Sequence, residues 1–171
     1  MSKKQTNIII TLVVIVIALF MILGFFGYGG FPISSNADDA LTAGNDLLEE
    51  LQSTGTVSDL RVQIISEGQG DGAKAGDLVT VNYVGLLTDG SVFDASSQHG
   101  GAFSFTLGIG QVIPGWDQGI VGMKVGERRL LAIPPSLAYG AQQVGTIPAN
   151  STLIFEVELL EIKADGATIA P

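Results

Sequence analysis

The 171-residue chain contains no cysteine, a single histidine and only eight lysine and arginine residues. Without cysteine it has no disulfide, no zinc–thiolate site and no thiol nucleophile. Its 17 acidic residues give a formal net charge of −9 at pH 7. Because nucleic-acid binding depends on clustered basic side chains that neutralise phosphates, we expect no nucleic-acid partner.

Side chains that catalyse bond-breaking reactions are equally scarce. The histidine, His99, stands in a polar loop without a histidine–carboxylate cluster, so neither a metal site nor a cofactor is expected. The serines lack the context of a nucleophile elbow. Asp94 follows an apolar strand, where its carboxylate could be held at the edge of a pocket, although local sequence alone favours a turn or cap role.

The longest uncharged run lies near the N-terminus, from Ile8 to Phe26. At about 1.5 Å per residue, 19 residues nearly cross a hydrocarbon core of roughly 30 Å. Lys3 and Lys4 precede the run, and the first charge after it is Asp38. The positive-inside rule therefore predicts a single-pass protein with a cytoplasmic N-terminus and its remaining residues outside, in a periplasmic or extracellular space.

A cleaved signal peptide is the alternative, since it too has a positive start and an apolar core, and the protein would then be secreted. Ser35 to Ala37 would be the small-residue cleavage site. The run is longer than the usual core of about 7–15 residues, and this site lies far from its end. The pattern favours a retained anchor.

Composition divides the chain into four parts. Residues 1–27 form the expected transmembrane anchor or uncleaved signal, and residues 28–57 an acidic linker with a possible short helix from Asp38 to Gln52. Residues 58–163 form the domain, and residues 164–171 are a tail. In the linker, Leu41, Leu47, Leu48 and Leu51 stand at roughly helical spacing.

Within the domain, apolar and polar residues alternate with period two. Strands are expected from about Leu60, over Leu78 to Leu87, around Arg129 to Ile133, and over Thr152 to Ile162. Glycine-rich loops separate them, and one short helix carries Trp116. The spacing predicts an α+β fold with a small antiparallel sheet around that helix.

Aromatic residues from five separate segments exceed what closing a core of this size requires. Taken singly each is a core residue; taken together they predict an apolar pocket with a polar rim, the usual form of a small-ligand or peptide site. They are Tyr83, Phe93, Phe103, Phe105, Trp116, Tyr139 and Phe155.

The domain contains a series of short motifs: VNYVG (81–85), DG (89–90) with VFDAS (92–96), VIPGW (112–116), AYG (138–140) and LIFEVELL (153–160). In this order and spacing, the motifs resemble those of one family, the FKBP-type peptidyl-prolyl isomerases, over about Ser58 to Lys163. The resemblance implies a five- to six-stranded antiparallel curved sheet around one short helix, with an apolar cleft between them.

The resemblance also implies residue roles. Trp116 would be the cleft floor, the backbone N–H of Ile113 and the Tyr139 hydroxyl would hold substrate carbonyls, and Phe93 and Asp94 would complete the catalytic set. The substrate-binding set would be Tyr83, Phe103, Val112, Trp116, Phe155, His99 and Ile147.

Two departures from the family pattern stand at the rim. His99 lies roughly where many relatives carry an arginine facing the aspartate, and a protonated His99 could replace that arginine. The loop from Gly140 to Pro148, which contains Ile147, is about one residue short.

The function that this resemblance implies is peptidyl-prolyl cis–trans isomerisation in exported or membrane-adjacent proteins. Proline-containing polypeptides would be the substrates and macrolides the inhibitors. A proline-peptide binding or chaperone module with little catalytic activity is the alternative.

Overall fold

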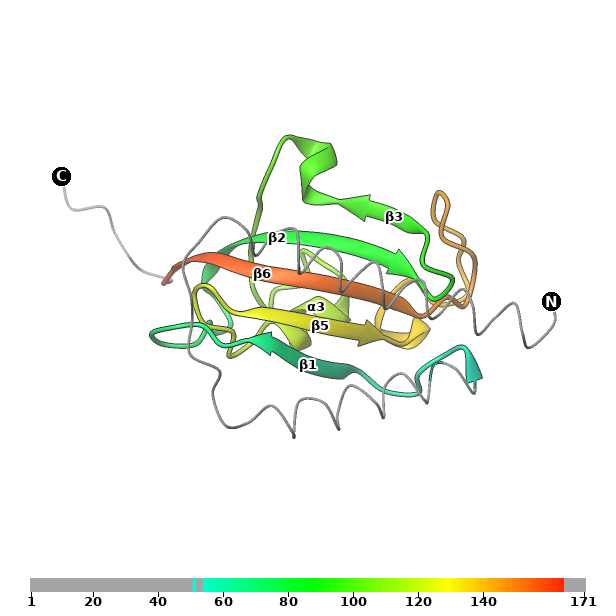
Figure 1. Cartoon of the computed structure of the whole chain (residues 1–171), viewed down its shortest axis with the longest axis horizontal. Helices are drawn as coiled ribbons and strands as arrows, with labels where there is room; N and C mark the ends of the chain where they lie inside the picture. The colour runs from blue at the N-terminus through cyan, green and yellow to red at the C-terminus, as the bar shows by residue number, and fades with distance from the viewer. Residues whose placement is uncertain (1–50, 52–53, 165–171) are drawn as a thin grey trace.

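The structure, a computed structural model, describes residue 51 and residues 54–164. Six antiparallel strands form one curved sheet in the order β1-β5-β6-β2-β3, and β4 pairs with β2 beside β3 (Figure 1). The strands are β1 (Arg61–Ser66), β2 (Leu78–Leu87), β3 (Val92–Ala95), β4 (Phe103–Thr106), β5 (Arg128–Ile133) and β6 (Leu153–Lys163).

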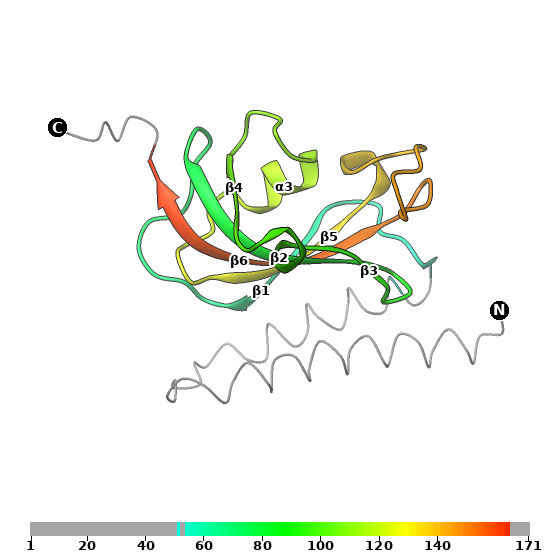
Figure 2. The ribbon, with the colours of Figure 1, turned by 90° about the horizontal axis from the view of Figure 1, so that it is seen from above.

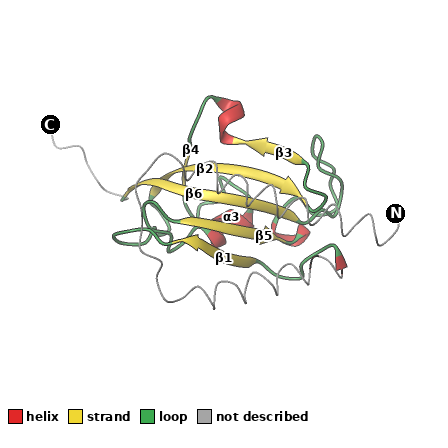
Figure 3. Cartoon of the chain, viewed as in Figure 1, coloured by secondary structure: helices red, strands yellow, loops and turns green. Residues whose placement is uncertain are grey.

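Three short helical segments complete the domain: η2 (Ser96–His99), α3 (Pro114–Gly119) and η3 (Pro135–Leu137). Figure 3 shows how little of the described chain is helical compared with the sheet, and Figure 2 shows α3 on one side of the curved sheet. The predicted antiparallel sheet around one short helix is confirmed.

The predicted transmembrane helix falls within residues 1–27, outside the described residues. Across residue 51 and residues 54–164, no helix is both long and apolar enough to cross a bilayer.

Strand alternation places one set of side chains against α3. In β6, Leu153, Phe155, Val157 and Leu159 are all buried, whereas Glu156 between them is partly exposed. The opposite residues of β2, including Val81 and Tyr83, face the same side. We call the side covered by α3 the inner face of the sheet and the other side the outer face.

Alternation predicts the edge strand β1 but not its burial. Val62 is paired with buried Leu131, yet Val62 remains 44 % exposed and Ile64 remains 40 % exposed. The strand forms the sheet edge beyond β5. It therefore has a neighbour on one side only, and its apolar residues are not covered as those of β6 are.

Helix α3 packs closely on the sheet because two glycines face it. Pro114 begins the helix. A backbone N–H at this position has no intrahelical acceptor, so proline, which lacks the N–H, loses no hydrogen bond there. A Cβ added at Gly115 would collide with Ile133, and one at Gly119 would lie 2.9 Å from Leu131. The two glycines thus let the backbone of α3 approach β5 and bring Trp116 down to the inner face.

Candidate functional site

A cavity of about 400 Å³ lies between α3 and the inner face of the sheet. Its size falls within the range of small-molecule and peptide sites. Residues from β2, β3, β4, β6 and α3 and from two loops line it: Tyr83, Phe93, Asp94, Phe103, Gln111, Val112, Ile113, Trp116, Tyr139 and Phe155.

Trp116 contacts the rings of Tyr83 and Phe155 edge to face. Its ring centroid lies 5.0 Å from that of Tyr83 and 5.2 Å from that of Phe155, with interplanar angles of 79° and 84°. The residue is only 4 % exposed, and its indole N–H has no hydrogen-bond partner within the described chain. Edge-to-face contacts of this kind fix ring orientation beyond what area burial alone provides.

Strands β3 and β4 supply two further rings. Phe93 stands perpendicular to Phe155, with centroids 5.4 Å apart. Phe103 is 41 % exposed at the cavity, whereas Phe105, two residues on, is buried and stacks on Phe103 at 5.6 Å. Phe105 therefore belongs to the core cluster beneath the cavity and does not line it.

The loop between β4 and α3 is held by side chains at both ends. The Asp117 carboxylate on α3 accepts hydrogen bonds from the N–H groups of Gly108 and Gly110, at 2.8 and 2.9 Å. Gln111 Oε1 accepts one from the Thr106 N–H at 2.7 Å. These contacts shape the loop that presents Val112 and Ile113 to the cavity.

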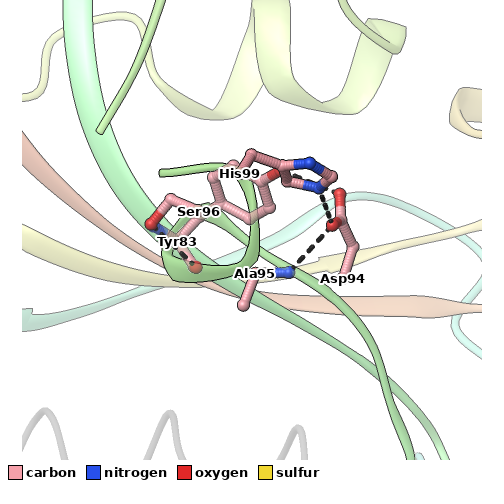
Figure 4. Close-up of polar contacts among 5 residues, drawn as sticks. All are labelled: Tyr83, Asp94, Ala95, Ser96 and His99. Atoms are coloured by element: carbon pink, nitrogen blue, oxygen red, sulfur yellow. Dashed lines mark hydrogen bonds and ion pairs between the residues drawn. The ribbon is translucent and has the colours of Figure 1, made fainter. Parts of the chain in front are cut away.

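Three donors surround the carboxylate of Asp94 (Figure 4). Its Oδ2 accepts a hydrogen bond from the Tyr83 hydroxyl at 2.8 Å, and Oδ1 accepts one from the Ala95 N–H at 2.9 Å. The Nε2 atom of His99 lies 2.6 Å from Oδ1. Ser96 Oγ accepts a hydrogen bond from the Tyr83 N–H at 3.2 Å, which ties η2 to β2.

The contacts of Asp94 shift the pKa values of two groups. Burial tends to raise the pKa of the Asp94 carboxyl, but the hydrogen bonds from His99 and Tyr83 outweigh it and hold that pKa below its usual value. Burial, reinforced by the hydrogen bond to Asp94, raises the pKa of Tyr83 well above its usual value. Near neutral pH the pair is therefore a carboxylate and a protonated phenol that donates to it.

This shift predicts that part of the stability depends on pH. Because the pKa of Asp94 is lower in the folded state, its carboxylate stabilises the fold fully above the unfolded-state pKa of about 4. That contribution is lost as the pH falls through the folded-state pKa. The difference in unfolding free energy between wild type and Asp94→Asn should shrink between pH 6 and pH 2.5, as measured by urea unfolding. A constant difference would contradict the prediction.

The structure places the eleven predicted site residues as follows. Nine line the cavity, including Tyr139, which is 37 % exposed after η3. Trp116, the predicted floor of the cleft, is one of these nine. His99, with a side chain 64 % exposed, contacts Asp94 outside the cavity lining. Ile147 is 5 % exposed and packs in the core.

Ile147 forms a tight turn with Val144. Its N–H donates to the Val144 carbonyl at 2.9 Å, and its carbonyl accepts from the Val144 N–H at 3.0 Å. The Asn150 N–H donates to the Gly140 carbonyl at 2.7 Å. Ile147 thus supports the loop after Tyr139 and is not part of the cavity lining, although the family resemblance predicts a substrate contact for it.

Gln111 lines the cavity without having been predicted. A polar residue between Gly110 and Val112 in an irregular loop carries no periodicity, and its bond to Thr106 depends on the return path of the chain. The only feature of the sequence that could indicate Gln111 as a lining residue is its position directly before the apolar pair Val112-Ile113.

Comparison with known proteins gives consistent results. The family model described as FKBP-type peptidyl-prolyl cis-trans isomerase matches residues 70–160. The chain is 56 % identical over 106 residues to FK506-binding protein 1A of Neurospora crassa, covering 61 % of this chain and 88 % of that protein. It is 50 % identical over 105 residues to FK506-binding protein 1 of Dictyostelium discoideum, covering 61 % and 98 %.

A solved structure matches as well. The crystal structure of FkpA from Escherichia coli superposes with a TM-score of 0.60 and 41 % sequence identity, covering 76 % of this chain and 62 % of that one.

Proposed function

Because this chain belongs to the FKBP-type peptidyl-prolyl cis-trans isomerases, we propose that the cavity beside Trp116 is where it isomerises X–Pro bonds. The observation that carries the assignment is the convergence of six aromatic rings and one hydrogen-bonded carboxylate on that cavity. The residue roles below follow from it.

Isomerisation of an X–Pro bond breaks no covalent bond, but it must cross a high energy barrier. Rotation about a peptide bond must cross about 18–20 kcal/mol, and unassisted X–Pro isomerisation takes tens to hundreds of seconds. In the twisted transition state amide resonance is lost, so the bond is less polar than in the planar amide. An apolar, water-poor cleft stabilises the twisted form more than the planar one, which is catalysis by differential binding.

The described contacts suit such a cleft. The proline ring would sit on the Trp116 indole between Tyr83 and Phe155, with Phe93, Phe103 and Val112 as walls. The Ile113 N–H has no acceptor within the described residues and lies in the cavity lining, so it is free to donate to a substrate carbonyl. The Tyr139 hydroxyl would hold a second carbonyl and fix the ring's orientation.

Asp94 and His99 would act at the rim. Asp94 holds the Tyr83 hydroxyl by a hydrogen bond and so orients the ring that packs on Trp116. His99 donates to, or pairs with, the same carboxylate. In this role His99 positions Asp94 and lies outside the proline pocket.

A proline-containing reporter peptide tests this assignment. Phe93→Ala should lower kcat/KM roughly tenfold, equivalent to about 1.4 kcal/mol of transition-state stabilisation, because it removes a cavity wall. Val92→Ala is the matched control, since Val92 is the preceding residue, is 52 % exposed and does not line the cavity. It should change kcat/KM little.

The outcomes separate the candidate functions. No acceleration by a well-folded wild type would overturn the catalytic assignment. Tight peptide binding at the cavity without acceleration would favour the alternative, a proline-peptide binding or chaperone module. Because the similar proteins are named for binding FK506, we also propose that a macrolide of that type occupies this cleft and competes with the peptide.

For the location of the enzyme, we propose a single-pass membrane protein with its isomerase domain outside the cytoplasm. The support is the uncharged run from Ile8 to Phe26, with Lys3 and Lys4 before it. In this arrangement residues 1–27 anchor the chain, residues 28–57 are the linker, residues 58–163 the domain and residues 164–171 the tail. The clients would be exported or membrane-adjacent proteins.

Protease treatment of intact cells or sealed vesicles tests the location. The full chain should sediment with membranes, retain Met1 to Lys4 by mass spectrometry, and lose its domain only to protease added on the outer side. A mature chain that begins after Ala37 and is released in soluble form would instead establish secretion after signal cleavage.

A further inference from the structure

The outer face of the sheet carries an apolar strip that the isomerase cleft does not use. One face of an antiparallel sheet is commonly solvated, and its residues there are polar. Here apolar residues of β2, β5 and β6 lie together on the outer face. The outer strip consists of Val84, Leu86, Leu130, Ala132 and Ile154.

Described residues that precede β1 cover part of this outer strip. Leu51, 8 % exposed, and Val57, 2 % exposed, belong to the same cluster as Leu86 and Ile154. Val57 is held there because its N–H donates to Thr152 Oγ1 at 3.3 Å.

Two hydroxyl groups strengthen this attachment. Thr56 Oγ1 and Thr152 Oγ1 lie 2.8 Å apart in a hydrogen bond between the chain before β1 and the residue directly before β6. The chain that leads into the domain is therefore fastened to the sheet at the edge of the outer strip.

Leu51 lies in the last turn of a helix. Leu51 and Thr54 have helical backbone, and the Gly55 N–H donates to the Leu51 carbonyl at 2.9 Å. Gly55 has a φ of 71°, the left-handed conformation that commonly ends a helix. A helix that ends at Gly55 would be formed by the residues just before Leu51, and these carry the leucines at helical spacing.

The helical pattern of that segment has one apolar side. Counting back from Leu51, Leu48 and Leu47 stand three and four residues away, and Leu41 stands ten residues away, so 3.6-residue periodicity puts all of them on one side. The opposite side would carry polar residues, among them Thr42 and Glu49.

The dimensions of segment and strip also agree. A helix from Leu41 to Leu51 is about 15 Å long. The outer strip crosses three neighbouring strands, β5, β6 and β2, whose axes span about 10 Å at the usual strand spacing. A helix of this length can therefore cover all three strands.

We propose that residues 38–52 dock as an amphipathic helix on the outer strip of the same chain. The occupant is this chain's own segment because Leu51, its last apolar residue, already lies in the cluster and Val57 is bonded beside it. The docked helix lies on the face opposite the cleft, so it leaves the cleft open. Docking also fixes residues 38–52, which belong to the expected linker, to the domain.

The absence of cysteine permits a direct accessibility test on the full chain. Leu130→Cys places one thiol on the outer strip, where docking shields it, and its reaction with a maleimide is followed by mass spectrometry. Adding Leu48→Asp should raise the labelling rate several-fold because a charge then faces the strip. Thr42→Asp, the matched control, adds the same charge on the opposite side and should leave the rate unchanged.

A second measurement identifies the occupant without altering the strip. A benzophenone maleimide is attached to the thiol of the Leu48→Cys variant. It should crosslink within one chain to peptides from β2, β5 or β6. Crosslinks between two chains would replace this proposal with a second copy as the occupant. Equal labelling in both aspartate variants, or crosslinks that avoid these strands, would also overturn it.

Discussion

Replacing Gly85 with valine should lower kcat/KM for a proline peptide on the order of 100-fold. A Cβ at this position of β2 would lie 2.7 Å from Cζ of Phe93 and 2.8 Å from Cε1 of Phe155. Both rings line the cavity, so valine must push them into the space the proline needs. Misplacement of about 1 Å in a site costs a factor of this size.

A rescue experiment separates ring displacement from general damage. Gly85→Val/Phe93→Ala removes one of the two rings that the new side chain meets. Its loss of unfolding free energy should be smaller than the sum of the two single losses, since contacting residues couple. Additive losses, or a Gly85→Val variant with wild-type kinetics, would show that the rings do not move as expected.

Replacing Gly115 with alanine should lower the free energy of unfolding by about 1–3 kcal/mol, as measured by urea unfolding. On helix propensity alone the change would stabilise α3 by up to about 1 kcal/mol. However, the new Cβ would collide with Cγ2 of Ile133 and lie 2.8 Å from its Cδ1. The helix must then move off β5 and carry Trp116 with it, so activity should fall as well.

Gln118→Ala in the same short helix is the control for this prediction. Gln118 is exposed, so its replacement tests helix propensity without the contact to β5 and should be close to neutral. A Gly115→Ala variant as stable as Gln118→Ala would mean that the helix–sheet approach tolerates an extra methyl group.

Much of the sheet could be predicted from local sequence. The alternation of apolar and polar residues within 78–87 and 153–163 predicts both long strands, because apolar residues such as Val81 and Val157 are buried, whereas polar residues between them such as Glu156 are partly exposed. The helix around Trp116 follows from its position between apolar strands. The burial of β1 could not be predicted, since it depends on whether another strand lies beyond it.

The candidate site was predictable where the family motifs contain its residues and less so elsewhere. Phe93 and Tyr139 stand in such motifs and line the cavity. The bonds of Asp117 to the loop at Gly108 and of Gln111 to Thr106 join residues whose separation depends on tertiary packing. The catalytic roles assigned to these positions stay predictions until variants are assayed.

The burial of the sole tryptophan has a spectroscopic consequence. Trp116 is the only indole in the chain and contacts the rings of Tyr83 and Phe155 at the cavity. Its intrinsic emission therefore originates at one place. A bound peptide that covers the indole changes the polarity around it and hence the emission wavelength, so fluorescence titration measures occupancy without a label. The same signal reports unfolding of the domain, because the indole then enters water.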